Sequence, residues 1–269
     1  MTSEASHKHP YTKLSIQVSL NGLSFCVLDT IGHKILVSER VDFKTASTPY
    51  LVLKELKSIL EKHDLTQKKY DEVSVIHTNH LYCLVPKSLF DKEELPNYLK
   101  FNAKILANDQ IVHDLLPNQD IVCVYVPFMN INNYLFECFG EFEFKHNSIA
   151  LLQTLFQQKS TQIVCYVHVG KRTMELTVME QRKLLLYNQF DYKTEADFLY
   201  YVLFVYEQLG LDVEVVSLKL FGAIAEGDAI FSLCQDYLTN VSLFTPFHSS
   251  YDSELIAHSD FYLTLLNNI

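Results

Sequence analysis

The feature that most constrains the fold of this chain is a stretch that occurs twice. Residues 15–45 read SIQVSLNGLSFCVLDTIGHKILVSERVDFKT, and residues 164–194 read VCYVHVGKRTMELTVMEQRKLLLYNQFDYKT. The two stretches align without a gap. Matched pairs are Lys34 and Lys183, Leu36 and Leu185, Asp42 and Asp191, Phe43 and Tyr192, Lys44 and Lys193, and Thr45 and Thr194. Strands often share apolar matches, but a polar ending at the same offset indicates an internal duplication.

Each copy contains three runs of alternating apolar and polar residues, which is typical of strands. The first turn of each copy is expected around Asn21-Gly22 or Gly170, and the second around Ile31-Gly32 or Glu180-Gln181. Such short turns join antiparallel neighbours. Each copy is therefore predicted to form a three-stranded antiparallel meander.

A helix and a further strand are expected after each meander. Thr48-Pro49 is a helix start ahead of YLVLKELKSILEKH, and Thr194 with Asp197 begins a helix that Gly210 ends. Apolar faces are expected at Leu53, Leu56 and Leu60, and at Leu199, Val202 and Tyr206. The strands that follow are predicted over residues 72–77 and 213–222. Each half thus reads β-β-β-α-β.

This doubled order resembles the duplicated ribonuclease H-like fold of the actin-like ATPases, an α/β fold with mixed sheets flanked by helices. The linking segment fits the same scheme, with a strand over residues 120–127, a helix in NINNYLFECFGE, a strand in EFEFKH and a helix in NSIALLQTLFQQ. That order is similar to the first domain of the pilus-assembly and cell-division branch. The chain is identified as a member of an uncharacterised actin-like-fold family of Bacteroidetes (DUF3822-like).

The resemblance implies domains over residues 12–158 and 159–269 after a disordered tail at residues 1–11. It also implies an Asp-x-Gly at the first turn of each meander, where aspartates organise Mg²⁺ and backbone N–H groups hold phosphates. In this sequence Ser19 stands at the aspartate's place in the first copy and Asn21 at the glycine's, followed by Gly22. The first copy is therefore expected to lack the charge that organises the metal.

The second copy keeps Gly170 but has His168 at the aspartate's place, and histidine is a poor ligand for Mg²⁺. Arg172 and Thr173 could still meet a phosphate, and Gly222 partly matches the glycines that bind adenosine. For His168 the alternative is a strand-end residue without a chemical role. For Gly222 it is a tight turn from strand to helix.

The remaining motifs and the composition exclude several classes of function. His77 and His80 have no acidic or cysteine partner beside them, so a metal site is not expected. Seven glycines without a phosphate-loop pattern argue against P-loop and Rossmann sites, and a net charge of −10 argues against nucleic-acid binding. Six scattered cysteines, no long apolar run and a polar N-terminal segment predict a cytoplasmic protein without membrane insertion.

These observations favour a non-catalytic scaffold or protein-interaction module that needs no cofactor and has an unidentified protein partner. The alternative is an ATP-binding or slowly hydrolysing member that uses Mg²⁺ at a rebuilt phosphate site. The C-terminal aromatic residues Tyr251, Phe261 and Tyr262 could anchor a partner or pack on the protein's own core.

Overall fold

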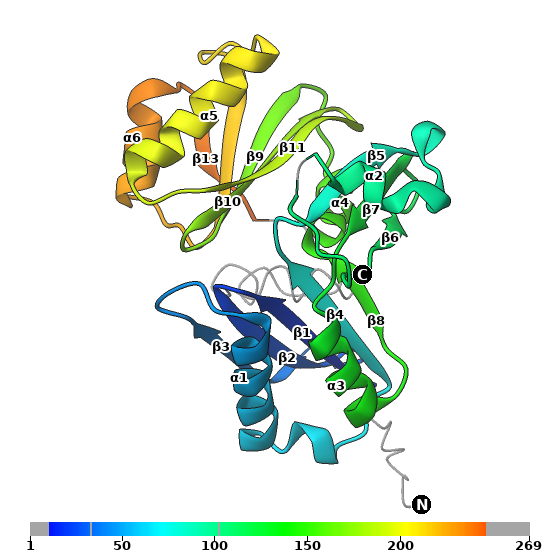
Figure 1. Cartoon of the computed structure of the whole chain (residues 1–269). Coiled ribbons are helices and arrows are strands. Elements are labelled where there is room, and N and C mark those ends of the chain that lie inside the picture. The colour runs from blue at the N-terminus through cyan, green and yellow to red at the C-terminus, as the bar shows by residue number, and fades with distance from the viewer. Residues whose placement is uncertain (1–10, 33, 102, 246–269) are drawn as a thin grey trace, which may run out of the picture. The chain divides into compact units, whose positions relative to one another are not determined.

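The computed structural model describes residues 11–32, 34–101 and 103–245, which divide into two compact units, residues 11–154 and 155–245. The expected tail at residues 1–11, apart from Tyr11, lies outside the described residues, as do Tyr251, Phe261 and Tyr262. Figure 1 shows the helices and strands of both units.

The first unit is built from eight strands and four α-helices. These are β1 (Thr12–Ser19), β2 (Gly22–Asp29), β3 (Lys34–Asp42), α1 (Pro49–Lys62), β4 (Glu72–Thr78), β5 (Tyr82–Pro86), α2 (Leu95–Leu99), β6 (Val112–Leu115), β7 (Ile121–Tyr125), α3 (Met129–Phe139), β8 (Glu143–His146) and α4 (Asn147–Phe156), which runs to the start of the second unit.

The second unit is built from five strands and two α-helices. These are β9 (Ile163–Val169), β10 (Thr173–Glu180), β11 (Lys183–Asp191), α5 (Glu195–Leu209), β12 (Ser217–Gly222), α6 (Ala229–Tyr237) and β13 (Val241–Leu243).

The main sheets of the two units have the same topology. Their strand orders are β3-β2-β1-β4-β8 and β11-β10-β9-β12-β13. In each, the first three strands are antiparallel neighbours, and the central strand pairs in parallel with the strand that follows the helix. The predicted mixed α/β architecture, with its β-β-β-α-β order in both halves, is confirmed.

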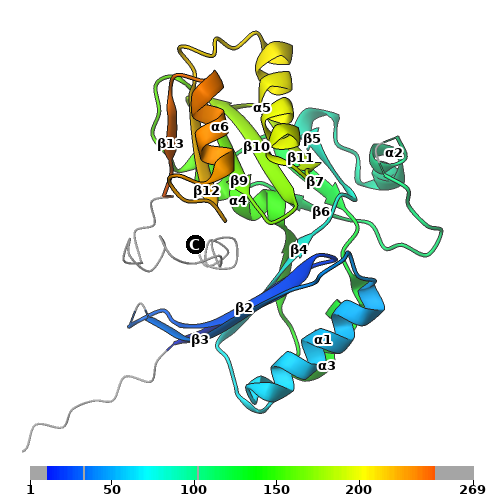
Figure 2. The same cartoon turned by 90° about the vertical axis from the view of Figure 1, so that its left-hand side faces the viewer.

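Helices cover one face of each sheet, and the core of each unit lies between them. In the first unit, Leu14, Ile16 and Val75 of the sheet pack with residues of α1 and α3. In the second, strands β9, β10 and β12 pack against α5 and α6 (Figure 2). Alternate residues of these strands point into the core, as the period of two predicts.

The helix ends form where their capping residues predict. Thr48 accepts a hydrogen bond from the backbone N–H of Leu51, and Pro49 opens α1. Thr194 and Asp197 form a reciprocal capping box at α5, and Gly210 ends that helix in the left-handed conformation. The expected apolar faces are confirmed, except that Leu53 is only partly buried.

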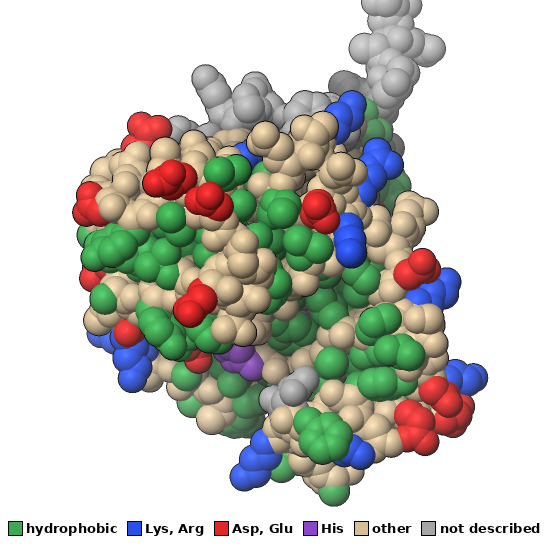
Figure 3. Space-filling model, turned by 90° about the horizontal axis from the view of Figure 1, so that it is seen from above, with side chains coloured by type: hydrophobic (Ala, Val, Ile, Leu, Met, Phe, Trp, Pro, Cys, Tyr) green, Lys and Arg blue, Asp and Glu red, His purple; other side chains and the backbone are tan. Residues whose placement is uncertain are grey.

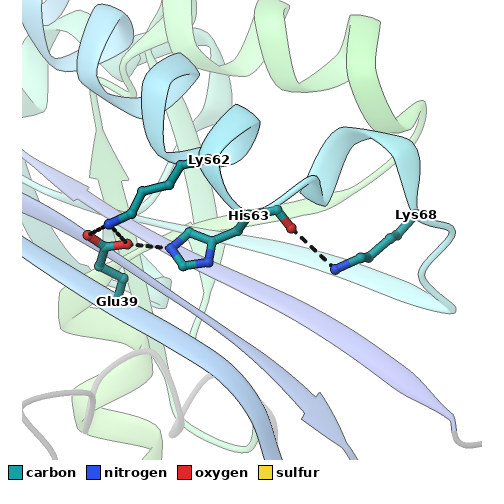
Figure 4. Close-up of polar contacts among 4 residues, drawn as sticks. All are labelled: Glu39, Lys62, His63 and Lys68. Carbon is teal, nitrogen blue, oxygen red and sulfur yellow. Dashed lines mark hydrogen bonds and ion pairs between the residues drawn. The ribbon is translucent and has the colours of Figure 1, made fainter.

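A polar cluster ties the end of α1 to β3 (Figure 4). Lys62 Nζ donates to both carboxylate oxygens of Glu39 at 2.7 and 2.9 Å, and His63 Nε2 contacts the second of these oxygens. Hydrogen bonds from Lys62 and then His63 lower the pKa of Glu39 below its ordinary value. Lys68 Nζ donates to the His63 carbonyl at 3.2 Å, so the loop after the helix is held as well.

Two parts of the fold differ from the sequence-based expectation. Along the chain, the segment between β4 and α3 forms a three-stranded sheet with the strand order β5-β7-β6. Of its strands, the sequence predicts only β7. The strand predicted over residues 213–222 starts at Ser217, because Asp212 holds the preceding residues in a turn. Its carboxylate accepts from the N–H of Glu214, and its carbonyl accepts from the N–H of Val216.

The gapless alignment of the two copies holds only for their third strands. Four residues separate Asp29 from its partner Lys34, whereas two separate Glu180 from its partner Lys183. The turn between the second and third strands is therefore longer by two residues in the first unit. The first two strands of each meander consequently correspond with a shift of two residues from the alignment.

Candidate functional site

The first turn of the first meander is closed by the side chain of Ser19. Its Oγ accepts from the backbone N–H of Asn21 at 3.2 Å and of Gly22 at 3.0 Å, and its hydroxyl donates to the Gly22 carbonyl at 2.8 Å. The backbone after β3 closes over the same turn, because Phe43 N–H donates to the Asn21 carbonyl at 2.8 Å and Ser47 N–H donates to the Leu20 carbonyl at 2.7 Å.

The second meander holds its first turn in a related way. Gly170 N–H donates to the Thr173 carbonyl at 2.8 Å, and Tyr192 N–H donates to the Arg172 carbonyl at 2.9 Å. The hydroxyl of Tyr192 also donates to the Gly170 carbonyl at 2.5 Å. The aromatic residue of the repeated ending thus binds the first turn in both units, which gives the ending a structural role.

His168 belongs to a hydrogen-bonded group that the sequence analysis missed. Its Nδ1 lies 2.9 Å from Oε2 of Glu175, and Tyr187 donates from its hydroxyl to Oε1 of Glu175 at 2.6 Å. The three residues come from β9, β10 and β11, and Glu175 is only 4% exposed. A buried carboxylate needs such donors. A signal was available, since Glu175 is the one charged residue in the apolar run MELTVM.

Gly222 lies beside this group at the end of β12. Its φ is +96°, and a Cβ there would lie 2.6 Å from the Val169 carbonyl oxygen and 2.8 Å from Cδ2 of His168. The His168 ring also packs against Phe221, with ring centroids 5.3 Å apart. Ala223 N–H then donates to the Val169 carbonyl at 2.7 Å, so the chain turns sharply after the strand.

Ser19 and His168 do not occupy equivalent positions in the two sheets. Val18 pairs with Leu23 across the first hairpin, and Val169 pairs with Met174 across the other. The residue that corresponds to Ser19 is therefore Gly170, and the counterpart of His168 is Gln17. The gapless alignment pairs Ser19 with His168 because it allows no gap for the two extra residues in the turn between β2 and β3.

The predicted site residues thus form two separate sets. Ser19, Asn21 and Gly22 form one turn of the first unit, and His168, Gly170, Arg172, Thr173 and Gly222 surround the corresponding turn of the second. Their assignment as binding residues stays a prediction. Chemically, the first set is a turn closed by a hydroxyl, and the second adds a histidine held by a buried carboxylate.

His77 of the first unit is held by hydrogen bonds to neighbouring residues. His77 is buried, with Nε2 2.9 Å from Oδ1 of Asn132, and its Nδ1 accepts from the N–H of Phe128 at 3.2 Å. Burial lowers the pKa of His77 to about 3. Among the described residues, no group of three or more His, Cys, Asp or Glu side chains could hold a metal ion.

Among the helices of the described part of the chain, none combines the length and the apolar character that a membrane span needs.

Comparisons with known proteins agree with this architecture. A protein of unknown function with an actin-like ATPase fold, from Bacteroides thetaiotaomicron, superposes with a TM-score of 0.78 at 20% identity over 99% of both chains. PilM, from the PilM–PilN type IV pilus biogenesis complex, gives a TM-score of 0.60 at 12% identity over 94% of this chain and 96% of its own. The cytoplasmic domain of EpsL, an inner membrane component of the type II secretion system of Vibrio cholerae, gives 0.47 at 14% identity over 96% and 94%.

The curated proteins contain no match to the sequence. A family model described as "Protein of unknown function (DUF3822)" matches residues 3–241, which is most of the chain. The predicted family and the predicted fold are therefore both confirmed: the chain belongs to the DUF3822 family and has the actin-like ATPase fold.

Proposed function

We propose that this protein is a non-catalytic scaffold or protein-interaction module, cytoplasmic and with domains over residues 12–158 and 159–269. The observation that carries the proposal is the closed first turn. Ser19 Oγ takes up the N–H groups of Asn21 and Gly22, the kind of donors that hold phosphates in active actin-like proteins. A hydroxyl also replaces the carboxylate that would organise Mg²⁺.

A second observation supports the proposal from the other unit. The counterpart of Ser19 there is Gly170, which has no side chain that could organise Mg²⁺, and its N–H donates to the Thr173 carbonyl. The structural relative PilM belongs to a complex with another protein, so a chain of this fold serves as a component of an assembly in that case. Fold alone does not decide function, so the proposal depends on these turns.

Thermal unfolding with and without millimolar ATP and Mg²⁺ tests the proposal. A ligand that binds only the native state raises the melting temperature by mass action. We expect no shift. An upward shift would overturn the proposal in favour of the ATP-binding alternative if Arg172→Ala abolishes it. The matched control is Arg182→Ala, at the exposed turn between β10 and β11, which should retain the shift.

A further inference from the structure

The helix α5 is apolar on the side that faces the core and also exposes large aromatic residues on the side that faces solvent. Phe198, Val202 and Val205 are buried in the core of the second unit. On the opposite side Tyr200 is 61% exposed and Phe204 is 40% exposed. The outer side of a surface helix normally carries charged and polar residues, so two large exposed aromatic rings are unusual there.

The two exposed aromatic rings are continuous with two partly buried ones, Tyr201 and Phe190. Tyr200 and Phe204 stack one helical turn apart, with ring centroids 6.1 Å apart and an interplanar angle of 21°. Tyr200 also contacts Tyr201 at 5.4 Å, and Tyr201 stacks on Phe190 of β11 at 4.5 Å. We call these four residues the aromatic stripe. Large aromatic side chains are the residues most enriched among interface hot spots.

The corresponding helix of the first unit carries no such stripe. The exposed positions of α1 include Lys54, Lys57, Glu61 and Lys62. Its exposed large apolar residues, Tyr50 and Leu51, are neighbours in the first turn and do not run along the helix. The two helices follow equivalent meanders and cover equivalent sheets. The fold therefore does not require an aromatic outer side at this place.

The segment that carries α5 and α6 is acidic. From Thr194 to Thr245 the sequence contains eight acidic residues and one basic residue, Lys219. Lys219 alternates along β12 with core residues that face α5 and α6, and its ammonium lies 5.7 Å from the Tyr166 ring and 5.6 Å from the Phe244 ring. It therefore points away from the helices.

Several of these acids are exposed on α5, α6 and the loop between α5 and β12. They are Glu195, Glu207, Asp212, Glu214 and Asp236. Figure 3 shows hydrophobic side chains gathered over the second unit with acidic side chains between them. A contiguous apolar surface with a charged rim is typical of a protein-binding site.

We infer that the aromatic stripe docks a basic amphipathic segment of a partner protein. The partner's apolar side chains would cover Tyr200 and Phe204, and its Lys or Arg side chains would face the acidic rim. This inference rests on the proposed function and names the chemistry of the partner. Opposite charges at the rim steer association and make it sensitive to salt.

Fluorescence anisotropy tests the inference with three synthetic helical peptides. One carries Leu and Lys at amphipathic spacing, the second replaces Lys with Glu, and the third replaces Leu with Ser. We expect the Leu/Lys peptide to bind, with an affinity that falls as salt rises. We expect each of the other two to bind at least tenfold more weakly, about 1.4 kcal/mol.

Matched variants distinguish the aromatic stripe from general adhesion. Tyr200→Ser with Phe204→Ser should weaken binding of the Leu/Lys peptide at least tenfold, whereas Tyr50→Ser, at a 74% exposed position of α1, should leave it unchanged. Glu207→Lys with Asp236→Lys should also weaken it, and Glu61→Lys with Glu93→Lys should not. Thermal unfolding of every variant checks that each one is folded.

Two results would overturn the inference. One is equal binding by the stripe variants and their controls, which would mean adhesion by net charge. The other is self-association of the wild type that only Tyr200→Ser and Phe204→Ser abolish, which would make a second copy the occupant. If ATP does not raise the melting temperature, either result leaves the scaffold proposal standing. A rise in melting temperature with ATP counts against the scaffold proposal, whatever the peptides do.

Discussion

The imidazole of His168 fills the space that a side chain at Gly222 would need. The closest ring atoms lie 2.8 and 3.0 Å from the position of a Cβ at Gly222, and the Val169 carbonyl oxygen lies 2.6 Å from it. The backbone at Gly222, with a φ of +96°, also disfavours any residue with a side chain. The histidine on β9 and the glycine on β12 therefore constrain each other.

Gly222→Ala should lower the free energy of unfolding by about 2–4 kcal/mol, because backbone strain adds to a clash with a rigid carbonyl. Gly227→Ala is the matched control, since Gly227 also has a positive φ, +85°, but nothing lies within 4 Å of its Cβ position. It should cost only the backbone term of about 1–2 kcal/mol. Urea denaturation measures both variants. Equal losses would show that His168 and the Val169 carbonyl move aside without cost.

Glu175→Gln should destabilise the second unit by about 1–3 kcal/mol, because an amide can accept from only one of the two donors that now face the carboxylate. Glu180→Gln, at an exposed position of the same strand, should change stability by less than about 0.5 kcal/mol. Combining Glu175→Gln with Tyr187→Phe should cost less than the two single changes together. Strict additivity in urea denaturation would contradict the hydrogen-bonded group.

Ser19→Ala should lower stability by about 1–2 kcal/mol, because the N–H groups of Asn21 and Gly22 lose their acceptor. The matched control is Ser58→Ala on the exposed side of α1, with an expected change of less than about 0.5 kcal/mol. Both are measured by urea denaturation at neutral pH. No loss for Ser19→Ala would mean that water replaces the hydroxyl, and the closed turn would then carry less of the functional proposal.

The depressed pKa of His77 predicts an acid sensitivity of the first unit. Above an unfolded-state pKa of about 6.5 neither state binds the proton, so the full stability is present. As the pH falls from there to about 3, the unfolded chain gains a proton that buried His77 does not accept. The free energy of unfolding should then fall by about 1.4 kcal/mol per pH unit on account of this residue.

His77→Gln removes this titration. The variant should be less stable than the wild type at pH 7 because it loses the packing of the ring, and the difference should narrow as the pH falls. His80→Gln is the control for a neighbouring histidine. A difference between wild type and His77→Gln that stays constant from pH 7 to pH 4, measured by urea denaturation, would contradict the prediction.

Sequence reasoning predicted the elements that have local signals. The period of two in the meanders, the capping residues Thr48 and Thr194 and the stop at Gly210 depend on neighbours along the chain, and the structure contains all of them. The start of β12 was predicted too early because Val213, Val215 and Val216 favour a strand by type. Asp212 overrides that preference with local hydrogen bonds.

The site was harder to predict because its contacts join distant strands. His168 and Glu175 meet only because they are register partners on β9 and β10, and Tyr187 reaches the same carboxylate from β11. The spacing of these three residues in the sequence matches no recognisable motif. Residue types alone matched Ser19 with His168, and only the pairing of strands shows that Ser19 corresponds to Gly170.

The two extra residues between β2 and β3 affect how the two halves of a related chain should be aligned with each other, and how one such chain should be aligned with another. A loop can absorb insertions while every inward-pointing side chain on the flanking strands keeps its orientation. Equivalent residues in such proteins are therefore identified by the register of the strands, that is, by which residues pair across neighbouring strands. Such a pair is called a rung of the sheet. Searches for lost or rebuilt nucleotide sites in this family are therefore best anchored on rungs such as Val18 with Leu23 and Val169 with Met174, rather than on distances counted along the chain.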